Sequence, residues 1–145
     1  MSGRAVALFA VVGIPALFYS SVPLGERRPY KSRRYAQETA ALRNLQIVNT
    51  AQVQYNSQFG RFARSLSELG PLASNLIPAD LAAGERQGYK FTLLETPQGY
   101  SIQAVPVAFG ATGSRTFYGD QSLILRENYG PEPATVSSKE VGGGS

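Results

Sequence analysis

The side chains that could do chemistry in this chain are carboxylates, lysines, tyrosines, serines and threonines. The 145 residues include no cysteine and no histidine, which excludes thiol catalysis, Cys/His zinc sites, histidine acid–base catalysis and histidine-ligated haem. A catalytic carboxylate needs a second reactive group, whereas Asp120 has only Arg115 and Arg126 nearby, the partners of a hairpin salt bridge. We therefore expect no catalytic residue, no cofactor, no metal ligand and no enzyme activity.

Two glycine-containing loops, at 84–88 and 110–113, lack the spacing and the following Lys-Ser/Thr of a phosphate-binding loop. A small-molecule site would have to use the loop at 108–115, so a ligand-binding module is one alternative for the chain. The eight tyrosines and seven phenylalanines mostly follow strand or helix spacing and are expected in the core. Three of them are candidate anchors of a protein interface: Phe109, Tyr118 and Tyr129.

The first element that must position these residues is an apolar segment at 5–24, which contains no charge. Twenty residues are about the length needed to cross the hydrocarbon layer as a helix. We expect residues 1–25 to be an uncleaved transmembrane anchor, not a cleaved signal peptide or a buried core helix, because 19–21 is a poor cleavage site. The predicted anchor residues are Ala5, Leu8, Phe9, Val12, Ile14, Leu17 and Phe18.

A basic stretch at 26–35 follows, which we interpret as a juxtamembrane linker. From Tyr35 onward the chain has eight basic and nine acidic residues, so the basic surplus lies in this stretch. Basic groups interleaved with aromatic rings can hold single-stranded nucleic acid, but beside a membrane segment they are more typical of binding to lipid phosphates. We expect contact with membrane lipid or a partner protein through Arg27, Arg28, Lys31, Arg33 and Arg34. We expect no nucleic acid and no small-molecule substrate.

The head domain is expected at 36–128. Residues 36–59 contain no Gly or Pro, and Gly60 is a natural helix stop. An apolar stripe at helical spacing, interrupted by Gln52, consists of Ala41, Leu42, Leu45, Val48, Tyr55 and Phe59.

Short helical turns are expected from the capping-box pattern at 65–68 and from the run at 77–84, which has Pro near its start and Gly at its end. Alternating residues predict strands at 88–95 and 100–107, and a hairpin of 115–118 and 122–126 with its turn at 119–121. Residues 129–145 are rich in Pro and Gly and are expected to form a tail. The fold class is therefore α+β, with a transmembrane segment and then a long helix packed on a roughly four-stranded antiparallel sheet.

Three stretches of the head carry an ordered pattern: Leu42-Arg-Asn-Leu-Gln-Ile-Val-Asn-Thr-Ala-Gln-Val-Gln-Tyr55, then Phe59-Gly-Arg-Phe62, then Ser65-Leu-Ser-Glu-Leu-Gly70. An aromatic near the helix end, a Gly-x-aromatic and a short Leu-x-x-Leu segment in this order resemble type IV pilins and the pseudopilins of type II secretion. The resemblance covers about residues 36–127 and implies a pilin-like head.

The front end differs from a prepilin, which has a Gly cleavage site and an acidic residue in its apolar helix. No Asp or Glu lies between Met1 and Leu24, and Pro29 is expected to break the link between anchor and helix. We therefore expect a non-catalytic, single-pass accessory or structural subunit of a larger membrane complex, for example a respiratory or photosynthetic one. The alternative is a divergent pilin or pseudopilin that polymerises into a filament.

The expected location is the bacterial inner membrane. Five basic residues follow the apolar segment and only Arg4 precedes it, so the positive-inside rule predicts a cytoplasmic head. The resemblance implies the opposite side, and we follow it, because a basic stretch can bind anionic headgroups on either face.

Overall fold

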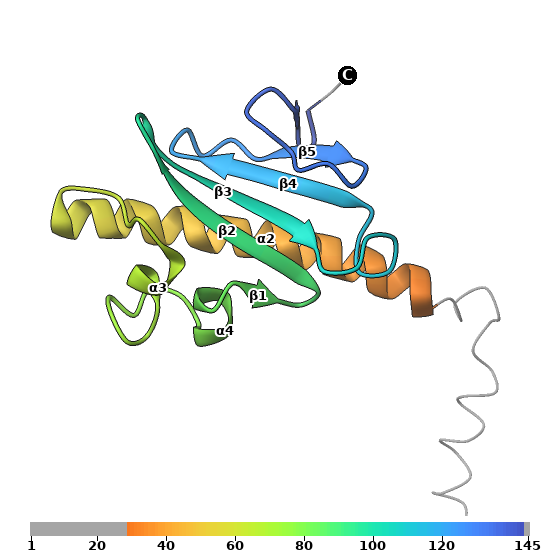
Figure 1. Ribbon diagram of the computed structural model, residues 1–145, viewed down its shortest axis with the longest axis horizontal. Helices are drawn as coiled ribbons and strands as arrows, with labels where there is room; N and C mark the ends of the chain where they lie inside the picture. Colours follow the sequence, from red (N-terminus) through yellow and green to blue (C-terminus); the bar gives the residue numbers. More distant parts are fainter. Residues whose placement is uncertain (1–28, 144–145) are drawn as a thin grey trace, which may run out of the picture. The chain divides into compact units, whose positions relative to one another are not determined.

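The structure is a computed structural model that describes residues 29–143, with side chains from residue 33 onward. A long helix lies along one face of an antiparallel sheet, and two short helices follow it at one edge (Figure 1). The helices are α2 Pro29–Phe59, α3 Leu66–Leu69 and α4 Ala79–Ala82, and the strands are β1 Glu85–Arg86, β2 Tyr89–Thr96, β3 Gly99–Pro106, β4 Arg115–Asp120, β5 Arg126–Tyr129 and β6 Lys139–Glu140.

The sheet has six strands in the order of the chain, each antiparallel to its neighbours. The α+β class and the packing of a long helix on an antiparallel sheet are confirmed, while the expected number of about four strands is too low. The two additional strands, β1 and β6, have two residues each, too few for a period-two pattern to appear in the sequence.

Helix α2 begins seven residues before the expected start at Ala36. Pro29 occupies the first turn, where its missing N–H costs nothing and its fixed φ is helical, and the expected break between anchor and helix involves residues outside the described part of the chain. The expected linker is therefore helical from Pro29 to Tyr35. The predicted stop is confirmed: Gly60 has φ +73° and donates its N–H to the Asn56 carbonyl at 2.8 Å.

The core lies between α2 and the sheet. The predicted helix stripe is confirmed in its main part, because Ala41, Leu45, Val48 and Tyr55 are buried. Phe59 is an exception at 56% exposed, since it ends the helix and lies with its ring 4.5 Å from that of Tyr55. The sheet supplies the opposite side through the predicted strand residues Tyr89, Phe91, Leu93, Tyr100, Ile102 and Ala104, all buried.

The predicted turn at 119–121 is wrong in position. Gly119 and Asp120 pair with Ile102 and Ser101 as the end of β4, and the chain turns at 121–125 instead. A Cβ on Gly119 would lie 3.3 Å from Ile102 and 3.4 Å from Asn49. This glycine therefore allows close packing between helix and sheet, and does not mark a turn.

The C-terminal part of the chain contributes to the head beyond residue 128. Ala134 is completely buried, and the carbonyl of Glu132 accepts a hydrogen bond of 2.7 Å from Thr116 in β4. Strand β6 then pairs with β5. Part of the expected tail therefore packs on the head, and Lys139–Glu140 extend its sheet.

The predicted anchor lies outside the described residues, as do Arg27 and Arg28. No helix within the described part of the chain is both long enough and apolar enough to cross a membrane.

Candidate functional site

One end of the head is formed where α2 begins, β3 and β5 end and β4 starts (Figure 1). We call it the basal end and define it by Arg33, Arg34, Tyr35, the loop at 107–114 and Tyr129. It contains residues that the sequence marks separately as a basic stretch, a candidate ligand loop and candidate interface anchors.

The loop at 107–114 is fixed to both layers of the head. The Arg34 guanidinium donates to the Gly110 carbonyl at 3.2 Å, which joins the loop to α2. The Val107 N–H donates to the Gly88 carbonyl at 2.9 Å, which joins it to the turn between β1 and β2. The loop therefore has contacts with the helix and the sheet at the same time.

Gly113 allows the loop to lie directly on the core. A Cβ at this position would collide with the ring of Tyr89, which is completely buried. The Tyr89 hydroxyl donates to the Arg115 carbonyl at 2.7 Å. Burial, and next the charge of Glu38, raise the pKa of this phenol, so it remains a neutral hydrogen-bond donor across the ordinary pH range.

Beneath the loop, one arginine lies between two carboxylates. Arg115 in β4 donates from Nε to Glu38 Oε1 at 3.1 Å and from Nη1 to Glu127 Oε1 at 2.8 Å. Its Nη2 lies 3.1 Å from the same Glu38 oxygen. The second Glu38 oxygen accepts hydrogen bonds from the Ser114 amide at 2.7 Å and the Ser114 hydroxyl at 2.9 Å. This Arg115 cluster joins α2, β4 and β5.

The Arg115 cluster is closed to solvent, with the Arg115, Glu38 and Glu127 side chains 13%, 8% and 7% exposed. Burial by itself lowers the pKa of Arg115, but the hydrogen bond to Glu127 and the charge of Glu38 outweigh it and raise the pKa. The guanidinium also lies over the rings of Phe117 and Tyr129, at 5.1 and 5.6 Å. A ligand anion would have to displace a carboxylate to reach Arg115, so the arrangement suits a structural role.

The three predicted interface anchors do not lie together. Phe109 and Tyr129 are exposed at the basal end, on segments joined by the Gly130 N–H, which donates to the Ser114 carbonyl at 3.3 Å. Tyr118 lies further along β4, half-buried, and donates its hydroxyl to Asp120 at 3.1 Å. Burial, and then this hydrogen bond, raise the pKa of Tyr118.

The predicted salt bridge of Asp120 with Arg115 and Arg126 is wrong. Arg115 is bound by the two glutamates, and Arg126 donates to the Ser138 carbonyl at 2.9 Å. Asp120 accepts from the Ser122 amide at 2.9 Å and so shapes the turn after β4.

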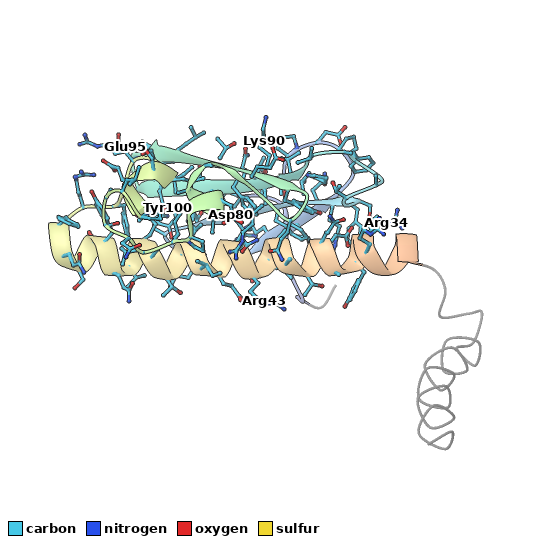
Figure 2. The ribbon with its side chains drawn as sticks, turned by 90° about the horizontal axis from the view of Figure 1, so that it is seen from below. Arg34, Arg43, Asp80, Lys90, Glu95 and Tyr100 are labelled. Carbon is cyan, nitrogen blue, oxygen red and sulfur yellow. The ribbon has the colours of Figure 1, made fainter. Side chains whose placement is uncertain are left out.

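The predicted basic contact residues are described only in part. Arg33 is exposed at the basal end, and Arg34 is half-buried and bound to the loop. Lys31 lies in the first turns of α2. Figure 2 shows Arg34 at this end of α2, with Arg43 further along the helix on the side away from the sheet and Tyr100 between helix and sheet.

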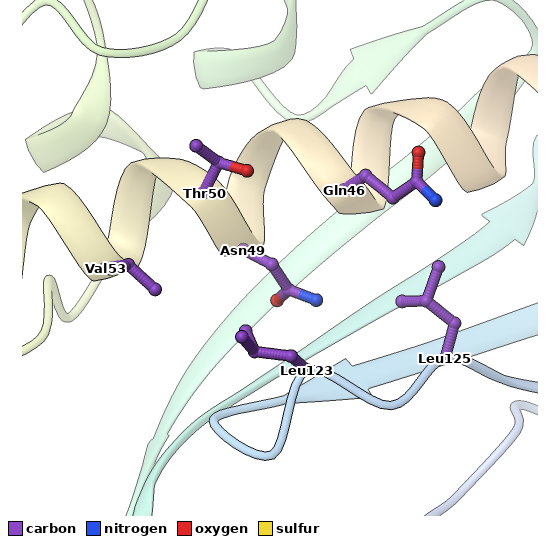
Figure 3. A pocket seen from close by; sticks show the side chains of 6 residues that line it. All are labelled: Gln46, Asn49, Thr50, Val53, Leu123 and Leu125. Carbon is purple, nitrogen blue, oxygen red and sulfur yellow. The ribbon is translucent and has the colours of Figure 1, made fainter.

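A second feature is a groove of about 320 Å³ between α2 and the turn after β4, which the sequence did not indicate (Figure 3). Leu123 projects there with φ +67° and is 52% exposed, a backbone conformation that costs a leucine about 1 kcal/mol or more. None of the lining side chains is ionisable, so the groove suits apolar or amide contacts. The lining residues are Gln46, Asn49, Thr50, Val53, Leu123 and Leu125.

Sequence reasoning missed Glu38 as the partner of Arg115, although the signal was present. Glu38 precedes Ala41 by three positions and so lies on the same buried stripe as Gln52. Polar residues in register with an apolar stripe indicate buried hydrogen-bonding groups. No cluster of three acidic residues that could hold a metal ion occurs in the part of the chain that the structure describes.

Comparison with known proteins finds no matching family model, curated protein or solved structure.

Proposed function

We propose that this chain is a non-catalytic accessory subunit of a larger membrane complex, with a pilin-like head carried by a single-pass anchor at 5–24. The proposed location is the bacterial inner membrane, with the head outside the cytoplasm. The partners are membrane lipid and other protein subunits.

The non-catalytic role rests on one observation: the buried carboxylates are all hydrogen-bonded to neighbouring groups of the head. Within the described residues, the buried carboxylates are Glu38, Asp120 and Glu127, and each accepts hydrogen bonds from neighbouring groups of the head. A general acid or base has to reach a substrate, whereas these groups hold α2, β4, β5 and the turn after β4 in place. The same scaffold leaves aromatic residues exposed at the basal end, as a contact surface requires.

The membrane part of the proposal is tested on the full chain in its native membranes. After washing with alkaline carbonate, we expect the chain to stay in the pellet, because a twenty-residue apolar helix is effectively irreversibly inserted. Full release into the supernatant would overturn the anchor. Protease protection of the head in sealed right-side-out and inverted vesicles then determines on which side it lies.

A second candidate, a divergent pilin or pseudopilin that forms filaments, gains support from one observation. Because α2 starts at Pro29, only residues 25–28 separate it from the apolar segment, so the connection is shorter than the expected linker at 26–35. Mass spectrometry of the native N-terminus separates the candidates. A start at Met1 or Ser2 supports the accessory subunit, and a trimmed, N-methylated residue supports the filament.

A further inference from the structure

The basal end exposes a group of aromatic and apolar side chains. Tyr35 and Tyr129 are each 69% exposed, Val107 is 53% and Phe109 is 49% exposed. They come from the start of α2, the loop at 107–114 and the end of β5, and Arg33, also exposed, precedes Tyr35 by two residues. Tyrosine and phenylalanine next to arginine suit the boundary between hydrocarbon and headgroups, where rings partition into the interface and guanidinium groups bind phosphates.

The length of the chain limits how far this end can lie from the apolar segment. Only residues 25–28 separate Leu24 from the start of α2 at Pro29. Fully extended, this connection spans at most about 17 Å, and the headgroup layer on each side of a bilayer is itself about 5–8 Å thick. If residues 5–24 cross the membrane, the basal end has to lie at or near its surface.

The loop is also held ready for such a contact. Arg34 fixes Gly110, Glu38 fixes Ser114, and Gly113 packs on Tyr89. Phe109 is therefore carried by a loop tied to helix and sheet, which lowers the ordering entropy lost on binding.

We propose that the basal end of the head is seated in the headgroup layer of an anionic bilayer, with Phe109 and Tyr129 in the interface. This inference rests on the proposed membrane anchor. It goes beyond that anchor in assigning a lipid contact to the folded head itself.

The chain contains no tryptophan, so a single introduced tryptophan reports its own surroundings. We would place the full-length Phe109→Trp and Phe59→Trp variants in nanodiscs of phosphatidylcholine and phosphatidylglycerol, with bromine high on the acyl chains as quencher. The two positions are matched, since both are phenylalanines about half exposed, 49% and 56%. Phe59 lies at the other end of α2, about 37 Å along the helix from Arg34.

We expect the tryptophan at 109 to be blue-shifted and to lose most of its emission to the brominated lipid, and the tryptophan at 59 to keep its emission. Equal, weak quenching at both positions in a chain that stays in the disc overturns the lipid seat and leaves the anchor intact. A chain that does not enter the discs overturns the proposed anchor as well.

The preference for anionic lipid is tested separately. In the Phe109→Trp background, Arg33→Ser should reduce quenching in discs that contain phosphatidylglycerol but not in discs of phosphatidylcholine alone. The control is Arg43→Ser, which removes an exposed arginine from the same helix on its side away from the sheet and should change nothing. A quenching signal that does not respond to lipid charge or to Arg33→Ser overturns the anionic preference.

Discussion

Gln52 shows how a polar residue can belong to an apolar stripe. It is completely buried between the hydrophobic residues of α2, and its amide side chain makes two hydrogen bonds to one residue. The nitrogen Nε2 donates to the Ala63 carbonyl at 3.0 Å, and Oε1 accepts from the Ala63 N–H at 2.8 Å. The Gln52 amide thus pairs with both backbone groups of Ala63, as a neighbouring strand would, and fixes the segment after Gly60 against the helix.

Replacing Gln52 by Leu should destabilise the head by about 2 kcal/mol or more, because both backbone groups of Ala63 would remain buried without partners. The measurement is urea unfolding of the full chain in detergent, followed by the near-ultraviolet signal of the tyrosines. Gln54→Leu, on the exposed face of the same helix, is the control and should change the free energy of unfolding by less than about 0.5 kcal/mol. Equal effects of both substitutions would contradict this role of Gln52.

Arg115→Met should destabilise the head by about 3 kcal/mol or more, because Glu38 and Glu127 would be left as buried charges without a cation. Arg64→Met removes an exposed ion pair with Glu95 at 3.2 Å and should be almost neutral. The triple variant Glu38→Gln, Arg115→Met, Glu127→Gln should recover part of the loss in the same unfolding measurement. If it is less stable than Arg115→Met alone, the explanation by uncompensated charge is wrong.

For the helices and strands, the reliable signals were the alternation of apolar residues and the residues that end or cap a helix. Alternation located β2 and β3 to within one residue and identified their buried sides, since Tyr89 and Tyr100 face the core as expected. Gly60 ended α2, and Ser65 capped α3, its hydroxyl oxygen accepting a hydrogen bond of 3.4 Å from the Glu68 N–H. These features depend on neighbours within a few residues, which a sequence displays directly.

Two of the errors share one physical cause, which is contact between distant segments. Gly119 was interpreted as a turn because its contact with Asn49 in α2 is not visible in the local sequence. Arg115 was assigned to Asp120, five residues away, although its partners come from α2 and β5. At the candidate site, the sequence therefore supplied the exposed aromatics but not the charged cluster that holds them.

The Glu68 carboxylate in the first turn of α3 makes stability depend on pH. The Arg64 amide, at 2.6 Å, and then the Arg61 guanidinium hold the pKa of Glu68 below its ordinary value of 4.5. Because the pKa is lower in the folded state, Glu68 stabilises the head above pH 4.5, and this contribution is lost as the pH falls through the folded-state pKa. Glu68→Gln should therefore be less stable than the wild type at pH 6, with the difference disappearing in acid. Urea midpoints of both proteins across this range would show it, and a constant difference would contradict it.

In the whole molecule, the last strands complete the sheet that covers α2. The Gln103 side chain donates to the Ala134 carbonyl at 3.2 Å, and Thr116, completely buried, donates to the Glu132 carbonyl. The part of the chain after Tyr129 therefore shields polar groups of the central strands. Its Pro and Gly content suggested a tail because composition does not reveal which carbonyls are used.

Deleting residues 131–145 should lower the free energy of unfolding by about 2 kcal/mol or more, since Thr116 would lose its acceptor and Ala134 its packing against the sheet. Val136→Ser, at a side chain that is 60% exposed, is the control and should have little effect. The urea midpoint again provides the measurement. A deletion variant as stable as the full chain would show that this part is a tail in energetic terms.

The chain-order sheet also determines how the head can form in time. Each strand pairs with the one made just before it, so hairpins can close locally and early as the polypeptide leaves the ribosome. The contacts that attach α2 span far more of the chain, 51 residues between Asn49 and Tyr100 and 77 between Glu38 and Arg115. Synthesis must pass Glu127 before the Arg115 cluster can assemble, so part of the apolar face of α2 remains uncovered while the strands are being made, when exposed apolar surface is a target for chaperones.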